Sequence, residues 1–171
     1  MDSQVVFTER QRFSQWWLWL ILLGMNGLFI FGSFQQLVAG KQFGDRPMSN
    51  NGLLLMTFLT ILISLLFYCF RLETYIKKDG IYVRFFPFQL KFKYYNWSNI
   101  KKSYVRRYKP ILEYGGWGWR MSISGKGKAL SVSGNHGLQL ELLDDKKLLI
   151  GTKSPEELTK ALNSVQHNHI S

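Results

Sequence analysis

The pattern of hydrophobic and polar positions divides the chain into two unlike parts. Two apolar stretches occupy most of the first 70 residues, from about residue 13 to 37 and from 52 to 70, and neither contains Asp, Glu, Lys or Arg. At about 1.5 Å per residue, roughly 20 helical residues cross the roughly 30 Å hydrocarbon layer of a bilayer. The pattern therefore predicts a transmembrane hairpin with a short polar connection over residues 41–51.

From Arg71 onward the apolar positions recur with period two, which is typical of β-strands. The alternation predicts about seven antiparallel strands between residues 72 and 152. Asp79-Gly80 has the composition of a two-residue hairpin turn between the first two of them. The third strand is predicted over residues 89–95, and its core-facing side chains are expected to be Leu90, Phe92 and Tyr94.

The last element predicted is a helix that begins near Ser154. Ser154 can cap it, Pro155 suits its first turn, and Glu157 completes a capping box. Leu158, Ala161, Leu162 and Val165 then fall on one face at helical spacing. The sequence thus predicts an α+β membrane protein in which one face of a terminal helix packs on a small sheet.

These elements predict four regions. They are a cytoplasmic N-terminal segment (1–12), the transmembrane hairpin (13–70), a β domain with its helix (71–165) and a flexible tail (166–171). Basic residues are densest on the side where the second span ends, so both termini are expected in the cytoplasm.

The β domain resembles bacterial membrane-anchored pleckstrin-homology-like (PH-like) proteins, in which one or two spans precede a β-barrel. The segments that carry the resemblance are Lys78 to Ile81, the Trp97-x-x-Ile100 corner, Tyr114 to Arg120, Gly134-x-x-Gly137-Leu138 and Leu149 to Leu158. The resemblance implies a PH-like antiparallel barrel or sandwich with a C-terminal capping helix. It also implies a scaffold role and a hairpin in the inner membrane of a bacterium, and it supplies no catalytic residues.

Charge adds a candidate surface. The chain has 171 residues and a net charge of +11, and 14 basic residues stand against three acidic ones between Arg71 and Lys128. Such an excess suits anionic lipid headgroups or an acidic partner, although cytoplasmic segments next to membranes are basic in any case. The residues expected to contact the membrane surface are Lys77, Lys78, Arg84, Lys91 and Lys93, with Arg84 joining Lys91 and Lys93 on one face.

A second candidate surface is the glycine- and aromatic-rich segment around residues 114–120. Tyr114, Trp117, Trp119 and Arg120 are candidates for a partner surface. The alternatives are that Trp117 and Trp119 insert into the membrane interface, or that the glycines allow tight turns while the rings cover the end of the barrel. In the first span, Gly24, Asn26 and Gly27 suggest a helix–helix interface, either with another subunit or with the second span.

Signals for catalysis are weak. The sequence suggests no nucleophile–base pair or phosphate loop. His136 is expected in a turn, and His167 and His169 are expected to be solvated in the tail, with loose metal binding by this pair as the alternative. Cys69 is expected to be a buried thiol, with acylation as the alternative.

The expected function is therefore a non-enzymatic scaffold that binds the bilayer and a protein partner or a second copy of itself. No cofactor, metal, nucleic acid or small-molecule substrate is expected. The alternatives are an accessory subunit of an inner-membrane complex and a component of a membrane enzyme or transporter.

Overall fold

The computed structural model describes residues 4–122 and 125–170, with side chains of the last helix described as far as Val165. The chain forms two compact units. One is helical and comprises Ser14–Cys69. The other is the β unit, in which Met1–Phe13 join Phe70–Ser171.

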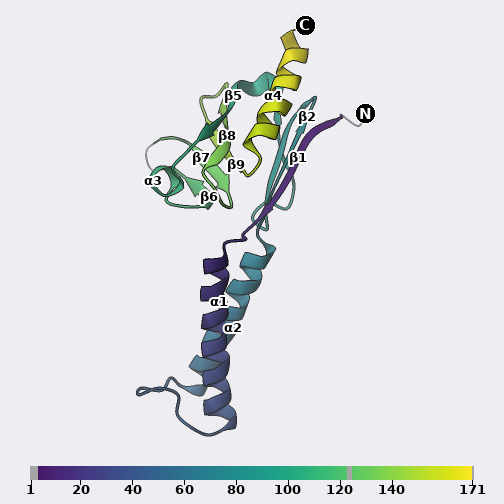
Figure 1. Ribbon diagram of the computed structural model, residues 1–171. Helices are drawn as coiled ribbons and strands as arrows, with labels where there is room; N and C mark the ends of the chain where they lie inside the picture. Colours follow the sequence, from purple (N-terminus) through teal and green to yellow (C-terminus); the bar gives the residue numbers. More distant parts are fainter. Residues whose placement is uncertain (1–3, 123–124, 171) are drawn as a thin grey trace. The chain divides into compact units, whose positions relative to one another are not determined.

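The helical unit consists of two long apolar helices, as the sequence predicts (Figure 1). Helix α1 (Trp16–Ser33) runs into a π-helical turn, η1 (Phe34–Val38), and α2 (Asn50–Cys69) follows after the loop. Asn26 Nδ2 donates a hydrogen bond to Ser64 Oγ at 2.6 Å, and the hydroxyls of Ser33 and Thr57 lie 2.8 Å apart. Polar side chains therefore link the two antiparallel helices.

The β unit contains two sheets. The first has the strand order β1-β2-β3-β4 and is antiparallel throughout. Its strands are β1 (Val5–Arg12), β2 (Arg71–Lys77), β3 (Gly80–Phe86) and β4 (Lys93–Asn96). The second has the order β5-β8-β9-β7-β6. Its strands are β5 (Ile100–Arg107), β6 (Gly118–Met121), β7 (Lys128–Ser131), β8 (His136–Leu142) and β9 (Lys147–Thr152).

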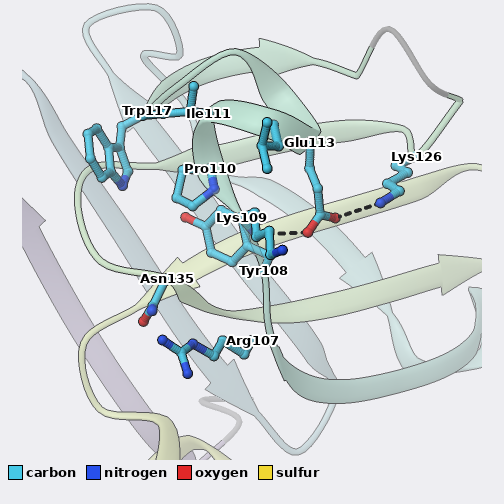
Figure 2. A pocket seen from close by; sticks show the side chains of 10 residues that line it. Arg107, Tyr108, Lys109, Pro110, Ile111, Glu113, Trp117, Lys126 and Asn135 are labelled. Atoms are coloured by element: carbon cyan, nitrogen blue, oxygen red, sulfur yellow. Dashed lines mark hydrogen bonds and ion pairs between the residues drawn. The ribbon is translucent and has the colours of Figure 1, made fainter.

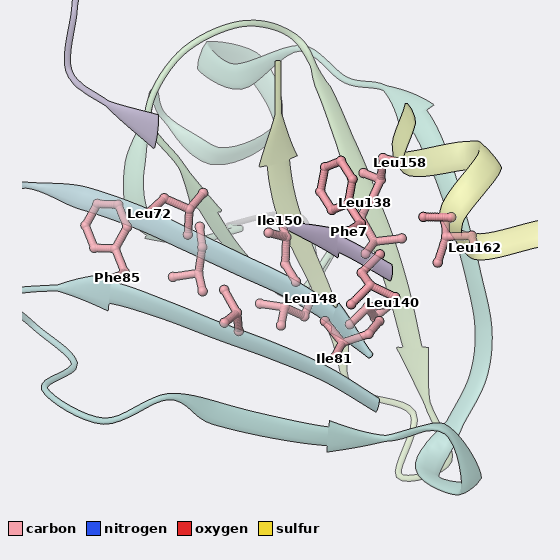
Figure 3. Close-up of a cluster of buried hydrophobic side chains, with 14 of the residues drawn as sticks. Phe7, Leu72, Ile81, Phe85, Leu138, Leu140, Leu148, Ile150, Leu158 and Leu162 are labelled. Atoms are coloured by element: carbon pink, nitrogen blue, oxygen red, sulfur yellow. The ribbon is translucent and has the colours of Figure 1, made fainter. Parts of the chain in front are cut away.

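One hydrophobic core lies between the two sheets and helix α4 (Pro155–Ile170) (Figure 3). Ile81, Val83 and Phe85 on β3 point into it, as the alternation predicts. The apolar face of α4 is buried as predicted, through Leu158, Ala161, Leu162 and Val165. This helix contacts β1 and β5, one edge strand of each sheet, so it covers the opening between those edges.

Of the two expected forms, a barrel or a sandwich, the barrel is wrong, because the strands do not close into one barrel but form separate sheets of four and five strands. The chain leaves the first sheet through a single 3-10 turn, η2 (Trp97–Asn99), where Trp97 Nε1 donates to the carbonyl of Lys77 at 3.1 Å. Trp97 and Ile100 pack against the core on either side of this corner. The sheets are also not wholly antiparallel, since β7 pairs with β9 in parallel.

The N-terminal segment is a full strand of the β unit rather than a separate region. Strand β1 pairs with β2 from Val5 to Arg12, with one irregularity near its start. Its inward positions are Phe7, Glu9 and Gln11, so only one of them is apolar. The Glu9 carboxylate accepts hydrogen bonds from Thr152 Oγ1 and from the backbone N–H of Lys153, each at 2.7 Å. Because two of the three inward residues of β1 are polar and bond to residues in or next to β9, the sequence of β1 shows no alternation of apolar and polar side chains.

The predicted third strand is displaced. Strand β4 begins at Lys93, and Leu90 is 73% exposed, whereas Tyr95 packs against the core. Aromatic residues occur at both even- and odd-numbered positions of this stretch, so the alternation does not decide which side chains face the core. A shift of the strand by one residue moves every side chain to the opposite face of the sheet. In the structure the inward side chains are Tyr95 and, two residues later, Trp97.

Three smaller corrections concern turns and ends. The first hairpin turn is Lys78–Asp79, since Lys77 pairs with Gly80. A Cβ on Gly80 would lie 2.4 Å from the carbonyl oxygen of Tyr95, so the close approach of β4 requires glycine there. The backbone of the predicted tail is helical as far as Ile170, as a continuation of α4.

Candidate functional site

Three arginines surround one buried carboxylate on the outer face of the first sheet, and we call Arg10, Glu73, Arg71 and Arg84 the arginine cluster. Arg10, Glu73 and Arg84 are direct cross-strand neighbours on β1, β2 and β3. Arg84 donates to Glu73 Oε2 from both Nε, at 2.7 Å, and Nη2. Glu73 Oε1 lies 3.4 Å from Arg10 Nε and 3.6 Å from Arg71 Nε. The carboxylate is only 6% exposed, so its charge is held chiefly by these guanidinium groups.

Neighbouring aromatic rings fix two of these arginines. The guanidinium of Arg71 lies 4.5 Å above the ring of Phe86, and that of Arg84 lies 4.4 Å above the ring of Phe92. Stacked guanidinium groups lose little freedom when they bind an oxyanion, because their planes are already oriented. The cluster has three positive charges against one negative charge and therefore carries a formal excess of two.

The five basic residues expected to form a membrane surface do not gather in one patch. Lys77 and Lys78 lie at the turn between β2 and β3, about 20 Å along β2 from Arg71 at the usual strand rise. Arg84 belongs to the arginine cluster. Lys93 pairs with Val83, whose side chain is buried, so Lys93 is on the opposite face from Arg84. Lys91 is exposed just before β4.

Neither Arg10 nor Arg71 is among the site residues expected from the sequence. The signal that could have joined them is the pairing of β1 with β2, which places Arg10 opposite Glu73 and Arg12 opposite Arg71. That signal was hidden because β1 was not predicted as a strand.

An open depression of about 960 Å³ lies beside the short helix α3 (Pro110–Tyr114) (Figure 2). Apolar Pro110, Ile111 and Trp117 line it together with the basic residues Arg107, Lys109 and Lys126. Glu113 also lines the depression, and its carboxylate meets Arg106 Nη2 at 3.0 Å and Lys126 Nζ at 3.2 Å and accepts from the backbone N–H of Lys109 at 2.8 Å. Glu113 thus joins the start of α3 to Arg106 of β5 and to Lys126, which precedes β7.

The surroundings of Glu113 change its acidity. Burial alone would raise the pKa, but hydrogen bonds from Arg106, from the Lys109 N–H and from Lys126 outweigh burial and lower the pKa of Glu113 to about 2. A carboxylate whose pKa is lowered by folding stabilises the protein above its ordinary pKa, and this contribution is lost as the pH falls toward the folded-state value.

We therefore expect the free energy of unfolding to fall as the pH is lowered from about 4.5 to about 2, with Glu113 contributing on the order of 2 kcal/mol of that loss. Glu113→Gln removes this contribution, so its unfolding free energy should depend less steeply on pH over that window. Denaturant titrations of both proteins between pH 2 and 7 measure the difference. Parallel pH profiles would contradict the assigned role.

The expected partner surface around residues 114–120 is divided by the fold. Tyr114 is buried and packs against Tyr108, so its placement on a surface is wrong. Trp117 lines the depression and donates from Nε1 to the Gly134 carbonyl at 2.9 Å, and exposed Arg120 donates from Nε to the Trp117 carbonyl. The glycines serve the turns, since Gly115, Gly116 and Gly118 all have positive φ.

Trp119 belongs to a chain of aromatic rings instead. Ring centroids of Phe13 and Phe70 lie 5.8 Å apart, those of Phe70 and Phe88 5.3 Å, and those of Phe88 and Trp119 5.8 Å. Phe88 and Trp119 are each about half exposed. Phe13 and Phe70 directly flank the helical segment in the sequence, so this aromatic chain begins where the β unit connects to the helices.

Within the helical unit, Asn26 and the glycines have different surroundings. Asn26 bonds to Ser64 of α2, which agrees with packing inside the hairpin. Gly24 and Gly27 are exposed, and a Cβ on either would meet nothing within 4 Å. The two glycines therefore do not mediate the α1–α2 contact.

The residues considered for metal binding or modification lie apart. Within residues 4–122 and 125–170, His, Cys, Asp and Glu form no group of three or more that could hold a metal ion. His136 begins β8, while the side chains of His167 and His169 lie outside the described ones. Cys69 is exposed at the end of α2, so the expected buried thiol is wrong.

Comparison with known proteins assigns a family. A family model described as "Family of unknown function (DUF6141)" matches residues 2–168. The chain belongs to this family. The match to DUF6141 covers both the helical unit and the β unit, including β1, so the two units occur together in the family's pattern. Its description names neither a PH-like fold nor an activity, and a comparison with curated proteins finds no significant match.

Proposed function

We propose that the protein is a membrane-anchored, non-enzymatic binding module. In this proposal α1 and α2 span the inner membrane of a bacterium, and the β unit lies at its cytoplasmic face. There it acts as a scaffold that binds a protein partner or a second copy of itself, with additional contact to anionic lipid.

The observation that carries the proposal is the ladder between β1 and β2. These strands flank the helical segment and pair with each other, with Arg12 opposite Arg71 where the chain passes into the helices. Only residues 13–15 separate β1 from α1, and only Phe70 separates α2 from β2. If both helices span a bilayer, strand pairing requires both connections to emerge on the same side. Such short connections keep the β unit within a few residues of the membrane surface.

The exposure of the helices supports insertion in lipid. Only 11% of the residues in each apolar window are buried within the protein. A core helix of a soluble protein would be mostly buried, whereas Leu23, Phe31 and Phe58 are each more than half exposed. Polar side chains between helices, such as Asn26 and Ser64, stabilise helix pairs in lipid.

The cytoplasmic assignment follows from charge. The basic residues that follow α2, beginning with Arg71, outnumber those in the loop between the helices, and loops rich in Lys and Arg remain in the cytoplasm. A small β module covered by a C-terminal helix is also what the PH-like resemblance implies, and such modules act by binding. Anchoring raises the local concentration of the module at the membrane, so weak contacts suffice.

Membrane extraction and crosslinking test this proposal together. We expect the full-length protein to remain with membranes after alkaline carbonate washing. After purification in mild detergent it should give reproducible crosslinks from the β unit to a protein partner or to another copy. Recovery in the soluble fraction contradicts the anchor, and a β unit without reproducible crosslinks contradicts the scaffold role.

Gly24 and Gly27 favour a second candidate, an accessory subunit of a larger inner-membrane complex. Both are exposed on α1 and leave room for close approach by a foreign helix.

In that case we expect Gly24→Leu and Gly27→Leu to abolish copurification of the partner while the melting temperature of the isolated protein stays unchanged, because both positions are exposed and a Cβ at either meets nothing within 4 Å. Leu54→Ala, at an exposed position of α2, is the matched control. Unaltered copurification in both glycine variants would exclude this helix face as the interface.

A further inference from the structure

We infer that the arginine cluster is a binding site for the phosphate group of an anionic membrane phospholipid, with Arg10 and Arg71 as its ligands. This inference rests on the proposed membrane insertion of the hairpin. It adds to that proposal a defined site and a chemical class of ligand.

The first argument is the supply of hydrogen-bond donors. Glu73 Oε2 is occupied by Arg84, whose Nη1 also lies 3.3 Å from the carbonyl oxygen of Leu90. The remaining oxygen, Oε1, lies 3.4 Å from Arg10 Nε and 3.6 Å from Arg71 Nε, so these two contacts are ion pairs without a short hydrogen bond. Among the described residues, no acceptor bonds the terminal nitrogens of Arg10 or Arg71, and Arg71 Nε is buried without a hydrogen-bond partner.

The second argument is geometric. Arg10, across from Glu73 on β1, and Arg71, two residues before Glu73 on β2, both approach the same carboxylate oxygen. The N–H donors of a planar guanidinium group have the spacing of two phosphate oxygens, and a phosphate group accepts several charge-assisted hydrogen bonds at once. Arg71 is only 28% exposed and stacks on Phe86, so one of the two ligands is held in place before any anion binds.

The third argument is charge. Glu73 compensates one of the three guanidinium groups, and the cluster retains two positive charges. Arg12, opposite Arg71 in the β1–β2 ladder, is a further basic residue on the same face. A phosphodiester or phosphomonoester would reduce this excess, and repulsion among the arginines favours its binding.

The position along the chain selects a lipid as the source of the phosphate. Arg71 follows the last residue of α2 by two positions, and Arg12 precedes the first residue of α1 by four. Helix ends of a membrane hairpin lie at the level of the headgroups, where phosphates are abundant. The cluster is also at the opposite end of β2 from the Lys78–Asp79 turn, so it is distinct from a site built on that loop.

Lipid titration of the full-length protein tests the inference. The protein is purified in a nonionic detergent, and the affinity for dioctanoyl phosphatidylglycerol is measured against dioctanoyl phosphatidylcholine. We expect phosphatidylglycerol to be preferred and Arg10→Gln/Arg71→Gln to weaken its binding at least tenfold. Lys102→Gln/Lys147→Gln removes the same charge from exposed positions of the second sheet and should change the affinity less than twofold.

Two further variants separate ligand binding from folding. Arg10→Lys/Arg71→Lys keeps the charges beside Glu73 but removes the planar forks, so an intermediate affinity is expected at an unchanged melting temperature. Glu73→Gln removes the competing carboxylate and should bind phosphatidylglycerol at least threefold more tightly, even if the protein melts earlier. Wild-type affinity in Arg10→Gln/Arg71→Gln, or an equal loss in the Lys102→Gln/Lys147→Gln control, overturns the inference.

Competing probes identify the source of the anion. Inorganic phosphate that displaces the lipid at equal concentration would assign the site to a free anion and overturn the lipid assignment. Tighter, cluster-dependent binding of a single-stranded oligouridylate would do the same in favour of nucleic acid. Carbonate extraction keeps the outcomes distinct, since a chain released by carbonate refutes the anchor while this titration still reports on the arginines.

Discussion

Phe7→Ala should lower the free energy of unfolding by about 3 kcal/mol, the largest single effect that we expect. Phe7 is 7% exposed and belongs to the core between the sheets and α4, although it lies on the N-terminal side of the helical segment (Figure 3). Truncation leaves a cavity where Leu158 and Leu138 pack nearby, and the loss of the ring removes a large apolar surface from the core.

Val6→Ala provides the matched control for this prediction. Val6 is the adjacent residue of β1 but is 37% exposed, so its truncation should cost less than about 0.5 kcal/mol. Chemical denaturation of both full-length variants in detergent, followed by tryptophan fluorescence, compares the two midpoints. Equal midpoints for Phe7→Ala and Val6→Ala would mean that β1 is not part of the folded β unit.

Glu73→Gln should destabilise the protein by about 2 to 3 kcal/mol. The substitution preserves size but leaves Arg10, Arg71 and Arg84 without a negative charge, and the removal of one partner from a largely buried ion pair is costly because the remaining charges stay desolvated. The three arginines keep part of their surface in water, which reduces the effect below that of a fully buried pair.

The salt dependence of this variant gives a second readout. Repulsion among the three guanidinium groups is screened by salt, so the loss of stability in Glu73→Gln should shrink as ionic strength rises. Asp144→Asn, which breaks an exposed pair with Lys146, should leave the midpoint unchanged. A Glu73→Gln variant as stable as wild type at low salt would show that the carboxylate does not hold the cluster together.

The elements predicted correctly are marked either by a continuous apolar run or by a single periodicity. The two long helices are uncharged apolar runs of membrane-spanning length, whereas the inward face of β3 and the apolar face of α4 each follow one periodicity. In β3 and α4 the pattern of side chains alone selects both the element and its buried face.

The elements predicted wrongly have inward faces that periodicity does not mark. The inward positions of β1 include Glu9 and Gln11, whose partners on β9 lie about 140 residues away in the sequence. The stretch before β4 offers apolar rings at both parities, so its register is decided by Tyr95 and Trp97 packing on the core. The inward face of β1 and the register of β4 depend on contacts between segments that are far apart in the chain, and these contacts cannot be read from a single sequence.

The candidate site, too, was only partly predictable from the sequence. The sequence indicated an excess of basic residues after α2, and it placed Arg84 among the candidates. The arginine cluster became visible only when β1 paired with β2, because this register sets Arg10 beside Glu73 and Arg12 beside Arg71. Conversely, the burial of Tyr114 and the pairing of Arg84 with Glu73 removed residues from the surfaces that the sequence suggested.

Cysteine accessibility in intact bacterial cells tests most directly whether a membrane hairpin is inserted between two paired strands. Cys69 is the only cysteine of the chain, so Cys69→Ser provides a background for Val5→Cys, Asp45→Cys and Lys147→Cys, which change exposed positions in β1, the interhelical loop and β9. We predict that a membrane-impermeant maleimide labels Asp45→Cys in intact cells, and that it labels Val5→Cys and Lys147→Cys only after lysis. Labelling of Val5→Cys and Lys147→Cys from opposite sides, or labelling of Asp45→Cys together with them only after lysis, would contradict the account.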